Sequence, residues 1–225
     1  LSPYHGGISG TGGLNFGLHV GDDPVKVREN RALLKKMLPS EPVWLNQIHG
    51  VNVVDAAKCA GAPDADASYT SAKNVVCVVM TADCLPVLLC ASDGMVVASV
   101  HAGWRGLVAG VLEKAVEAVR KISGSEIMAW LGPAIGPDAF EVGEDVKIAF
   151  VRKDRRMSAA FKRNGTRDGK YLADIYALAR QILNGVGIVR IYGGDFCTVS
   201  DPGRFYSYRR DGVTGRMATG IWIAS

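Results

Sequence analysis

Three apolar runs follow one another between residues 75 and 100, and they constrain the fold more than any other feature. Val75–Met80, Leu85–Cys90 and Met95–Val100 each have the length and composition of a strand. If the last two form a hairpin through Ser92-Asp93, opposed residues face each other at about 4.5–5.5 Å between Cα atoms. A turn one position later, at Asp93-Gly94, would shift that pairing. The stretch therefore predicts a hairpin whose register decides which side chains meet at its open end.

The open end of this hairpin carries side chains that can bind a metal. With the Ser92-Asp93 turn, Cys84 lies opposite His101, whereas the later turn places Cys84 opposite Gly103. A second histidine, His49, comes from an earlier segment and must approach from another strand end. One thiolate and two imidazoles suit zinc, and three protein ligands with an open fourth position are typical of a catalytic site. The alternative is that Cys84 is a buried thiol and both histidines make ordinary hydrogen bonds.

Charged and aromatic residues near these ligands predict a substrate site. Asp83 could orient a ligand or move a proton. Arg105 lies near the start of a helix expected at about Gly106, where free N–H groups favour phosphate; the alternative is packing on Trp104. The run 205–210, FYSYRR, offers aromatic rings for stacking and two cations, or else forms a half-buried edge strand with a basic end.

The remaining segments predict an α/β fold. A helix begins at Asp23-Pro24 and stops at Pro39, and an amphipathic helix spans residues 107–122. Further helices are expected at Glu141–Val151 and Leu172–Leu183. Additional strands are expected at Val43–Ile48, Val51–Val54, Ile127–Leu131, Ile188–Tyr192, Phe205–Tyr208 and Ala218–Ile223. We expect a single domain over residues 1–225, with mixed β-sheets flanked by helices.

Composition narrows the class of protein. Hydrophobic residues make up 48% and charged residues 21% of 225 residues, which is typical of a globular domain. The net charge of +4 is dispersed, favouring an anionic small substrate over nucleic acid. No apolar run approaches the roughly 20 residues that span a bilayer, and no signal peptide is visible. Five irregularly spaced cysteines do not form a disulfide framework, so we expect a cytoplasmic protein without a membrane partner.

Several motifs together resemble the YfiH-like family, also called the laccase-domain or polyphenol-oxidase-like family. They are NQIHG, MTADCLPVLL, VHAGWRGL, LGPAIGPDAFEVG, KYLADIYALARQ, GGDFCT and SYRRDGVTGRMA, between about Gly6 and Ile223. The resemblance implies a layered α/β fold and zinc held by His49, Cys84 and His101. It also implies phosphorolysis of adenosine, guanosine, inosine and methylthioadenosine, together with deamination of adenosine. Some enterobacterial members are linked to peptidoglycan editing.

The chain departs from the family near its start. Members usually carry Thr-Arg-x-Gly-Gly, whereas this sequence has Tyr4 in place of the arginine. If that arginine helps to hold phosphate, the departure bears on phosphorolysis more than on metal binding.

On this interpretation the chain is an enzyme acting on purine nucleosides and phosphate. Cys84, Asp83 and Arg105 take part in the chemistry, with Asp83 moving a proton. Arg105, Arg209, Tyr208 and Gln47 contact substrate. Zinc would activate water for deamination, while cations would hold phosphate for attack on the ribose C1′.

Three other functions remain open from the sequence. Copper-dependent polyphenol oxidation fits the older family name, although a chain with four histidines cannot supply the roughly ten that a multicopper site needs. A thiol hydrolase would use Cys84 as nucleophile and His101 as base on a peptidoglycan precursor. A non-enzymatic zinc domain would need a fourth protein ligand, for which Cys197, His5 and His19 are candidates. The oligomeric state does not follow from the sequence.

Overall fold

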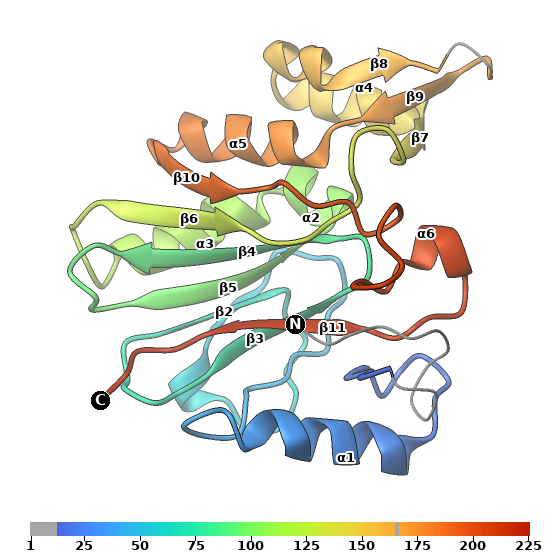
Figure 1. The fold of residues 1–225 in the computed structure, drawn as a ribbon. Coiled ribbons are helices and arrows are strands. Elements are labelled where there is room, and N and C mark those ends of the chain that lie inside the picture. The colour runs from blue at the N-terminus through green and yellow to red at the C-terminus, as the bar shows by residue number, and fades with distance from the viewer. Residues whose placement is uncertain (1–12, 165–166) are drawn as a thin grey trace.

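A six-stranded mixed sheet lies at the centre of the computed structural model, which describes residues 13–164 and 167–225. In spatial order its strands are β1 (Val53–Asp55), β2 (Ala67–Thr70), β5 (Val97–Ala102), β4 (Leu85–Ala91), β6 (Ile127–Leu131) and β10 (Arg190–Gly193) (Figure 1). The outer pairs, β1–β2 and β6–β10, are parallel, and the inner pairs are antiparallel. The predicted mixed α/β class is confirmed.

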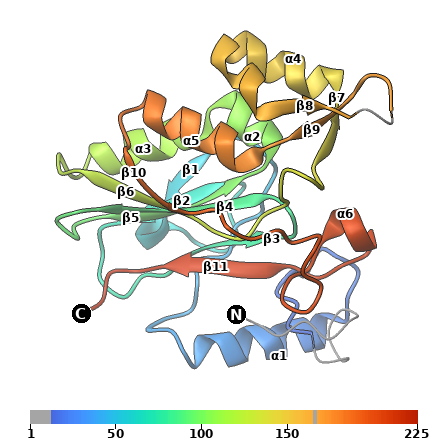
Figure 2. The same cartoon turned by 45° about the horizontal axis from the view of Figure 1, so that its top comes forward.

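Layers cover both faces of this sheet. One face carries α2 (Trp104–Ala109), α3 (Val111–Arg120) and α5 (Ile175–Gly185), and the other carries the pair β3 (Cys77–Thr81) and β11 (Met217–Ile221) (Figures 1 and 2). Successive side chains of β5 point to opposite faces of the sheet and so contact both layers. Val100 faces the helices, while Ser99 donates a hydrogen bond to the carbonyl of Thr219 in β11 at 3.2 Å. The hairpin formed by β4 and β5 is therefore enclosed between the helices and the β3–β11 pair.

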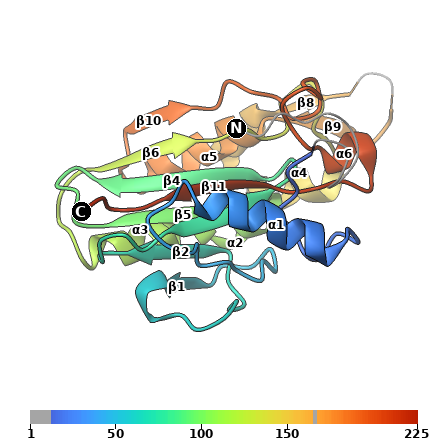
Figure 3. The same cartoon turned by 60° about the horizontal axis from the view of Figure 1, so that its bottom comes forward.

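The first helix forms the outermost layer on the β11 side. Asp23 caps α1 (Pro24–Lys35) by accepting a hydrogen bond from the backbone of Val25, as predicted. Figure 3 shows α1 in front of β11, and Leu34 packs there against a cluster that contains Phe16. None of the helices in the described part of the chain combines the length and apolarity that a membrane span requires.

A smaller unit lies beyond α2 and α5. It contains β7 (Glu141–Gly143), α4 (Glu144–Lys153), β8 (Phe161–Arg163) and β9 (Lys170–Ala173), with β9 at the centre of a three-stranded sheet. The helices expected at 141–151 and 172–183 therefore begin with short strands. Short helices complete the chain: η1 (Ala56–Lys58), η2 (Arg155–Ala160) and α6 (Tyr208–Asp211).

The hairpin register corrects the favoured sequence prediction. Pro86, not Cys84, lies opposite His101, so the turn sits one position later and Cys84 falls opposite Gly103. Gly94 has φ +72°, a conformation that glycine adopts without strain, and Met95 donates its N–H to Asp93 Oδ1 at 3.0 Å. The turn therefore centres on Asp93-Gly94, the alternative considered above.

Three other element predictions were wrong. Residues 43–48 make only isolated bridges, because the Gln47 side chain takes the place of a strand backbone beside β3. The strand expected at 205–208 is absent, and α6 begins there behind the cap Ser207. The helix expected at 107–122 is two helices, separated by Gly110 at φ +102°.

Candidate metal centre

His49, Cys84 and His101 come together at one end of the central sheet. His49 is exposed in the loop before β1, Cys84 is half-buried between β3 and β4, and His101 is buried in β5. Their ligand atoms all lie within 4.8 Å of one another, and Cys84 Sγ is 3.8 Å from His49 Nε2. The cluster forms in spite of the shifted register, and its three donors can hold one metal ion.

The glycine opposite Cys84 makes room for this cluster. A Cβ at Gly103 would lie 2.9 Å from His49 Cδ2 and 3.2 Å from Cys84 Sγ. A side chain at this position would push His49 and Cys84 out of their present positions, so the absence of a side chain at Gly103 lets the two ligands approach. The later turn thus places the smallest residue where the metal ligands need space.

Asp66 links the two histidines, although nothing in the sequence singled it out. Its fully buried carboxylate accepts a hydrogen bond from His101 Nδ1 at 2.7 Å, which leaves Nε2 for the cluster. The same carboxylate accepts from the backbone N–H groups of Ile48, His49 and Gly50, at 3.3, 2.9 and 2.6 Å. These bonds hold His49 in a left-handed conformation, φ +58°, which is strained for a side-chain-bearing residue. One carboxylate therefore positions two ligands from distant segments.

The electrostatics favour a thiolate in this cluster. Burial raises the pKa of the Cys84 thiol, but His101 and His49 outweigh burial and lower that pKa to about 6. Burial lowers the pKa of His101, while Cys84 and Asp66 raise it to about 9. A thiolate with two imidazoles is a donor set that zinc accepts, and copper accepts it too. The residues present therefore fit a transition-metal ion.

Asp83 lies beside the cluster with its carboxylate already engaged. Oδ1 accepts from Thr198 Oγ1 at 2.5 Å, and Oδ2 accepts from the backbone N–H of Arg209 at 2.6 Å. The residue is buried and has φ +87°, a strained conformation directly before Cys84. These contacts tie the Cys84 turn to α6, so positioning accounts for the Asp83 geometry better than proton transfer does.

The two predicted phosphate-binding arginines differ in their surroundings. Arg105 is exposed in the first turn of α2, and its guanidinium stacks on Trp104 at 4.6 Å from the ring centroid. Arg209 donates from Nη1 to the carbonyls of Glu141 at 2.9 Å and Ala139 at 3.4 Å. Arg105 thus keeps its hydrogen-bonding groups available, whereas Arg209 joins α6 to the small sheet.

The other two predicted substrate contacts, Gln47 and Tyr208, also differ in whether their side chains are already engaged. Gln47 Nε2 donates to the carbonyl of Met80 and Gln47 Oε1 accepts from the Met80 N–H, both at 2.7 Å. Its amide is therefore committed to β3. Tyr208 is exposed at the start of α6, with its ring open to solvent.

No fourth protein ligand joins the cluster within residues 13–164 and 167–225. Cys197 Sγ instead accepts a hydrogen bond from the N–H of Gly136 at 3.2 Å. The pKa of His19 is lowered by burial and by the charges of Arg216 and Arg31. His5 and Tyr4 lie outside the described residues.

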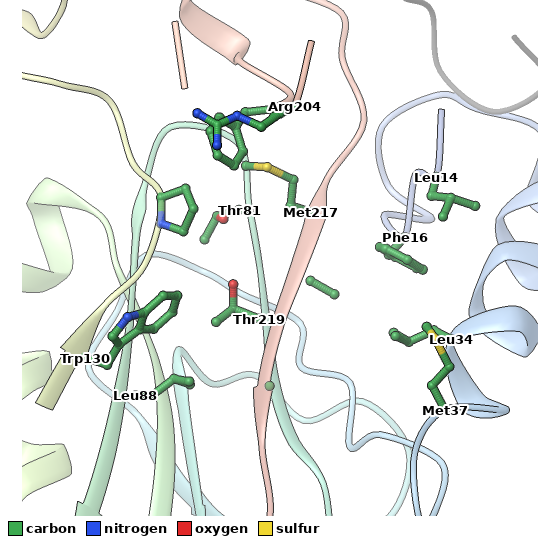
Figure 4. A pocket seen from close by; sticks show the side chains of 14 residues that line it. Leu14, Phe16, Leu34, Met37, Thr81, Leu88, Trp130, Arg204, Met217 and Thr219 are labelled. Atoms are coloured by element: carbon green, nitrogen blue, oxygen red, sulfur yellow. The ribbon is translucent and has the colours of Figure 1, made fainter. Parts of the chain in front are cut away.

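Side chains on both sides of β11 line a mainly apolar cavity of about 330 Å³ (Figure 4). None of the three cluster residues lines it, and the hydroxyl of Thr81 is buried there without a hydrogen-bond partner. Its walls include Leu14, Phe16, Leu34, Thr81, Trp130 and Thr219. The cavity is thus separate from the metal centre.

Comparison with known proteins supports the sequence resemblance. Residues 2–224 match the family described as multi-copper polyphenol oxidoreductase laccase. A Shigella flexneri protein named purine nucleoside phosphorylase YfiH is 55% identical over 216 residues, covering 93% of this chain and 86% of the relative. Its Escherichia coli K12 counterpart, with the same name, is 54% identical over the same shares.

Solved structures agree with this relationship. A Neisseria meningitidis protein of the DUF152 family is 51% identical, with a TM-score of 0.91 over 98% of this chain and 91% of that chain. YlmD from Geobacillus stearothermophilus is 30% identical, with a TM-score of 0.86 over 99% of this chain and 90% of that chain. The chain therefore belongs to the multi-copper polyphenol oxidoreductase laccase family, which confirms the YfiH-like resemblance.

Proposed function

We propose that this chain is a zinc-dependent purine nucleoside enzyme that phosphorolyses nucleosides and deaminates adenosine. The observation that carries the proposal is the cluster of His49, Cys84 and His101, in a chain whose relatives are named purine nucleoside phosphorylases. The exposed His49 leaves one side of the cluster open to a small molecule. Three protein ligands with an open side are typical of catalytic zinc.

The residues of the chain divide the work of this reaction. Zinc held by His49, Cys84 and His101 would supply a Lewis acid for a substrate oxygen or a water molecule. In phosphorolysis a phosphate oxygen forms a bond to ribose C1′ while the bond from C1′ to the purine nitrogen breaks, and the purine takes up a proton. In deamination water adds at C6 and ammonia leaves. Asp66 keeps both histidines in place, and Arg105 is a candidate for contacting phosphate.

The test incubates zinc-loaded protein with adenosine, with and without inorganic phosphate. We expect adenine and ribose 1-phosphate only when phosphate is present, and inosine in both mixtures. Chromatography separates the purines, and phosphorus NMR detects the sugar phosphate. Cys84→Ser, which lacks the thiolate, is expected to lose both activities, whereas exposed Asp138→Asn keeps them. Absence of adenine and inosine, with an authentic phosphorylase active in parallel, contradicts the proposal.

Copper-dependent oxidation of phenols is the second candidate. The family description favours it, and a thiolate with two imidazoles binds copper more tightly than zinc in general. Metal analysis of protein from cells grown without added copper, combined with an oxidase assay, separates the two candidates. Copper at full occupancy with phenol turnover would favour oxidation. Full activity after exhaustive chelation would instead favour Cys84 as a nucleophile in a hydrolase.

A further inference from the structure

Arg216 lies beside the metal centre, immediately before β11. Its neighbour Met217 is paired with Thr81, so Arg216 runs alongside Ala82, next to the turn that carries Cys84. The backbone of Arg216 is held on its other side: its N–H donates to Asn15 Oδ1 at 2.8 Å and its carbonyl accepts from Phe16 at 3.1 Å. The position of this residue is therefore fixed by strand pairing and by an earlier loop.

The guanidinium of Arg216 is only partly used. Nη1 donates to the carbonyls of Thr214 and Gly215, both at 3.0 Å. No described residue accepts from Nε or Nη2, and no described carboxylate forms an ion pair with this half-buried side chain. Nε and Nη2 point to the same side of a guanidinium and form the edge that grips two oxygens of an anion at once. The unused edge is thus the one suited to an oxyanion.

The packing around Arg216 keeps this edge in place. A Cβ at Gly17 would lie 2.8 Å from Arg216 Cγ, so the loop passes directly over the stem of the side chain. Burial lowers the pKa of Arg216, while the negative charges of Cys84 and Asp83 raise it. Arg216 therefore lies within the electrostatic field of the cluster. A half-buried cation without a carboxylate partner is costly unless an anion joins it.

We propose that Arg216 and the open side of the His49–Cys84–His101 cluster form a subsite for a tetrahedral oxyanion, represented by inorganic phosphate. The proposal rests on the proposed function, because phosphorolysis requires a phosphate next to the ribose C1′ of the bound nucleoside. Asp83 does not compete for the guanidinium, since Thr198 and the backbone of Arg209 occupy its carboxylate. Arg209 likewise donates from Nη1 to two carbonyls, but it is exposed, whereas Arg216 is half-buried and runs alongside Ala82, next to the turn that carries Cys84.

Phosphate binding to the zinc-loaded protein tests this subsite without relying on turnover. Isothermal titration calorimetry measures the binding of inorganic phosphate to the wild type and to two variants. Arg216→Met removes both the charge and the bidentate donor edge, whereas Arg216→Lys keeps the charge only. We expect the phosphate Kd to rise at least about tenfold in Arg216→Met and less in Arg216→Lys. Exposed Arg152→Met on α4 is the matched control and keeps the wild-type Kd. Folded Arg216→Met with wild-type affinity overturns the proposal, as does loss of affinity in Arg105→Met alone.

A second measurement uses the wild-type protein, so it stands even if Arg216→Met fails to fold. Phenylglyoxal modifies accessible arginines, and mass spectrometry locates the modified residues. Phosphate is expected to protect Arg216 and to leave Arg152 unprotected; equal modification of Arg216 with and without phosphate contradicts the subsite. Phosphate bound through Arg216 without any product from adenosine would remove the proposed function and leave the subsite standing. If Arg216→Met forms products with an unchanged KM for phosphate, the proposed function stands and the Arg216 subsite is contradicted.

Discussion

Asp66 has no solvent exposure, yet its carboxylate accepts hydrogen bonds from the ring of His101 and from the backbone around His49. Burial raises the pKa of Asp66, but the hydrogen bonds from His101, Gly50 and His49, together with the charge of His101, outweigh burial and lower that pKa. The side-chain amide of asparagine has the same shape as the Asp66 carboxylate, but its NH₂ group is a donor and cannot accept from the N–H groups that surround it. Asp66→Asn is therefore expected to weaken metal binding about 10- to 100-fold, measured by competition with a chromophoric chelator.

The matched control for this change is Asp138→Asn, an exposed aspartate that is not part of the cluster. It is expected to keep the wild-type metal affinity. Equal affinities for Asp66→Asn and wild type would show that the carboxylate does not position the ligands.

Protons and metal compete for the same side chains in this cluster. With the pKa of Cys84 at about 6 and that of His101 at about 9, the metal-free site between those values holds a thiolate and an imidazolium. Metal binding must then displace one proton, from His101. Raising the pH removes that proton, so affinity is expected to increase about tenfold per pH unit between pH 6 and 9. Competition titrations at several pH values check the slope, and a flat profile contradicts it.

The three metal ligands could be found from the sequence, whereas their support could not. His49, Cys84 and His101 belong to recognisable motifs, and the structure places their donor atoms within 4.8 Å. Asp66 sits in an unremarkable Ala-Asp-Ala segment, and its role arises from contacts with residues 17 and 35 positions away. Arg216 gains its place only through the pairing of β11 with β3. Such contacts are tertiary, so local patterns do not reveal them.

The spacing of apolar residues predicted that a helix is present, but not where it is interrupted. Apolar residues continue at helical spacing through Gly110, so the pattern predicts one helix where the structure has α2 and α3. The break matters, because α2 then packs on the loop after His49: a Cβ at Gly106 would lie 3.1 Å from the Gly50 carbonyl. The hairpin was predicted correctly as an element, but its register depended on a single turn position.

Gly110 provides a prediction at this scale. Its φ of +102° is unfavourable for any residue with a Cβ, although the nearest atom to such a Cβ, on Glu113, is 3.6 Å away. Gly110→Ala is therefore expected to lower the free energy of unfolding by about 1–2 kcal/mol through backbone strain alone. The control is Gly124→Ala, because Gly124 is exposed and has nothing within 4 Å of an added Cβ; this variant is expected to lack the backbone strain. Chemical denaturation compares the two, and equal stabilities would contradict the strain argument.

At the scale of the whole molecule, the mixed α/β class followed from the sequence, but the order of the layers did not. The pairing of β11 with β3 joins residues more than 130 positions apart, and this pair covers one face of the central sheet. No local signal specifies that partnership. It encloses Ser99 and places Arg216 alongside Ala82, next to the Cys84 turn, so the position of Arg216 depends on the last strand.

A metal at this site connects three parts of the fold, because its ligands come from the loop before β1, the turn before β4 and β5 itself. An ion that binds the folded state and not the unfolded chain stabilises it by about 2.7 kcal/mol at a concentration of 100 times its Kd. For a chain of this size, that corresponds to a Tm increase of roughly 5–10 °C. Calorimetry with excess zinc and with a chelator measures the difference. Cys84→Ser is expected to lose most of it, and an undiminished increase in that variant would place the stabilising ion elsewhere.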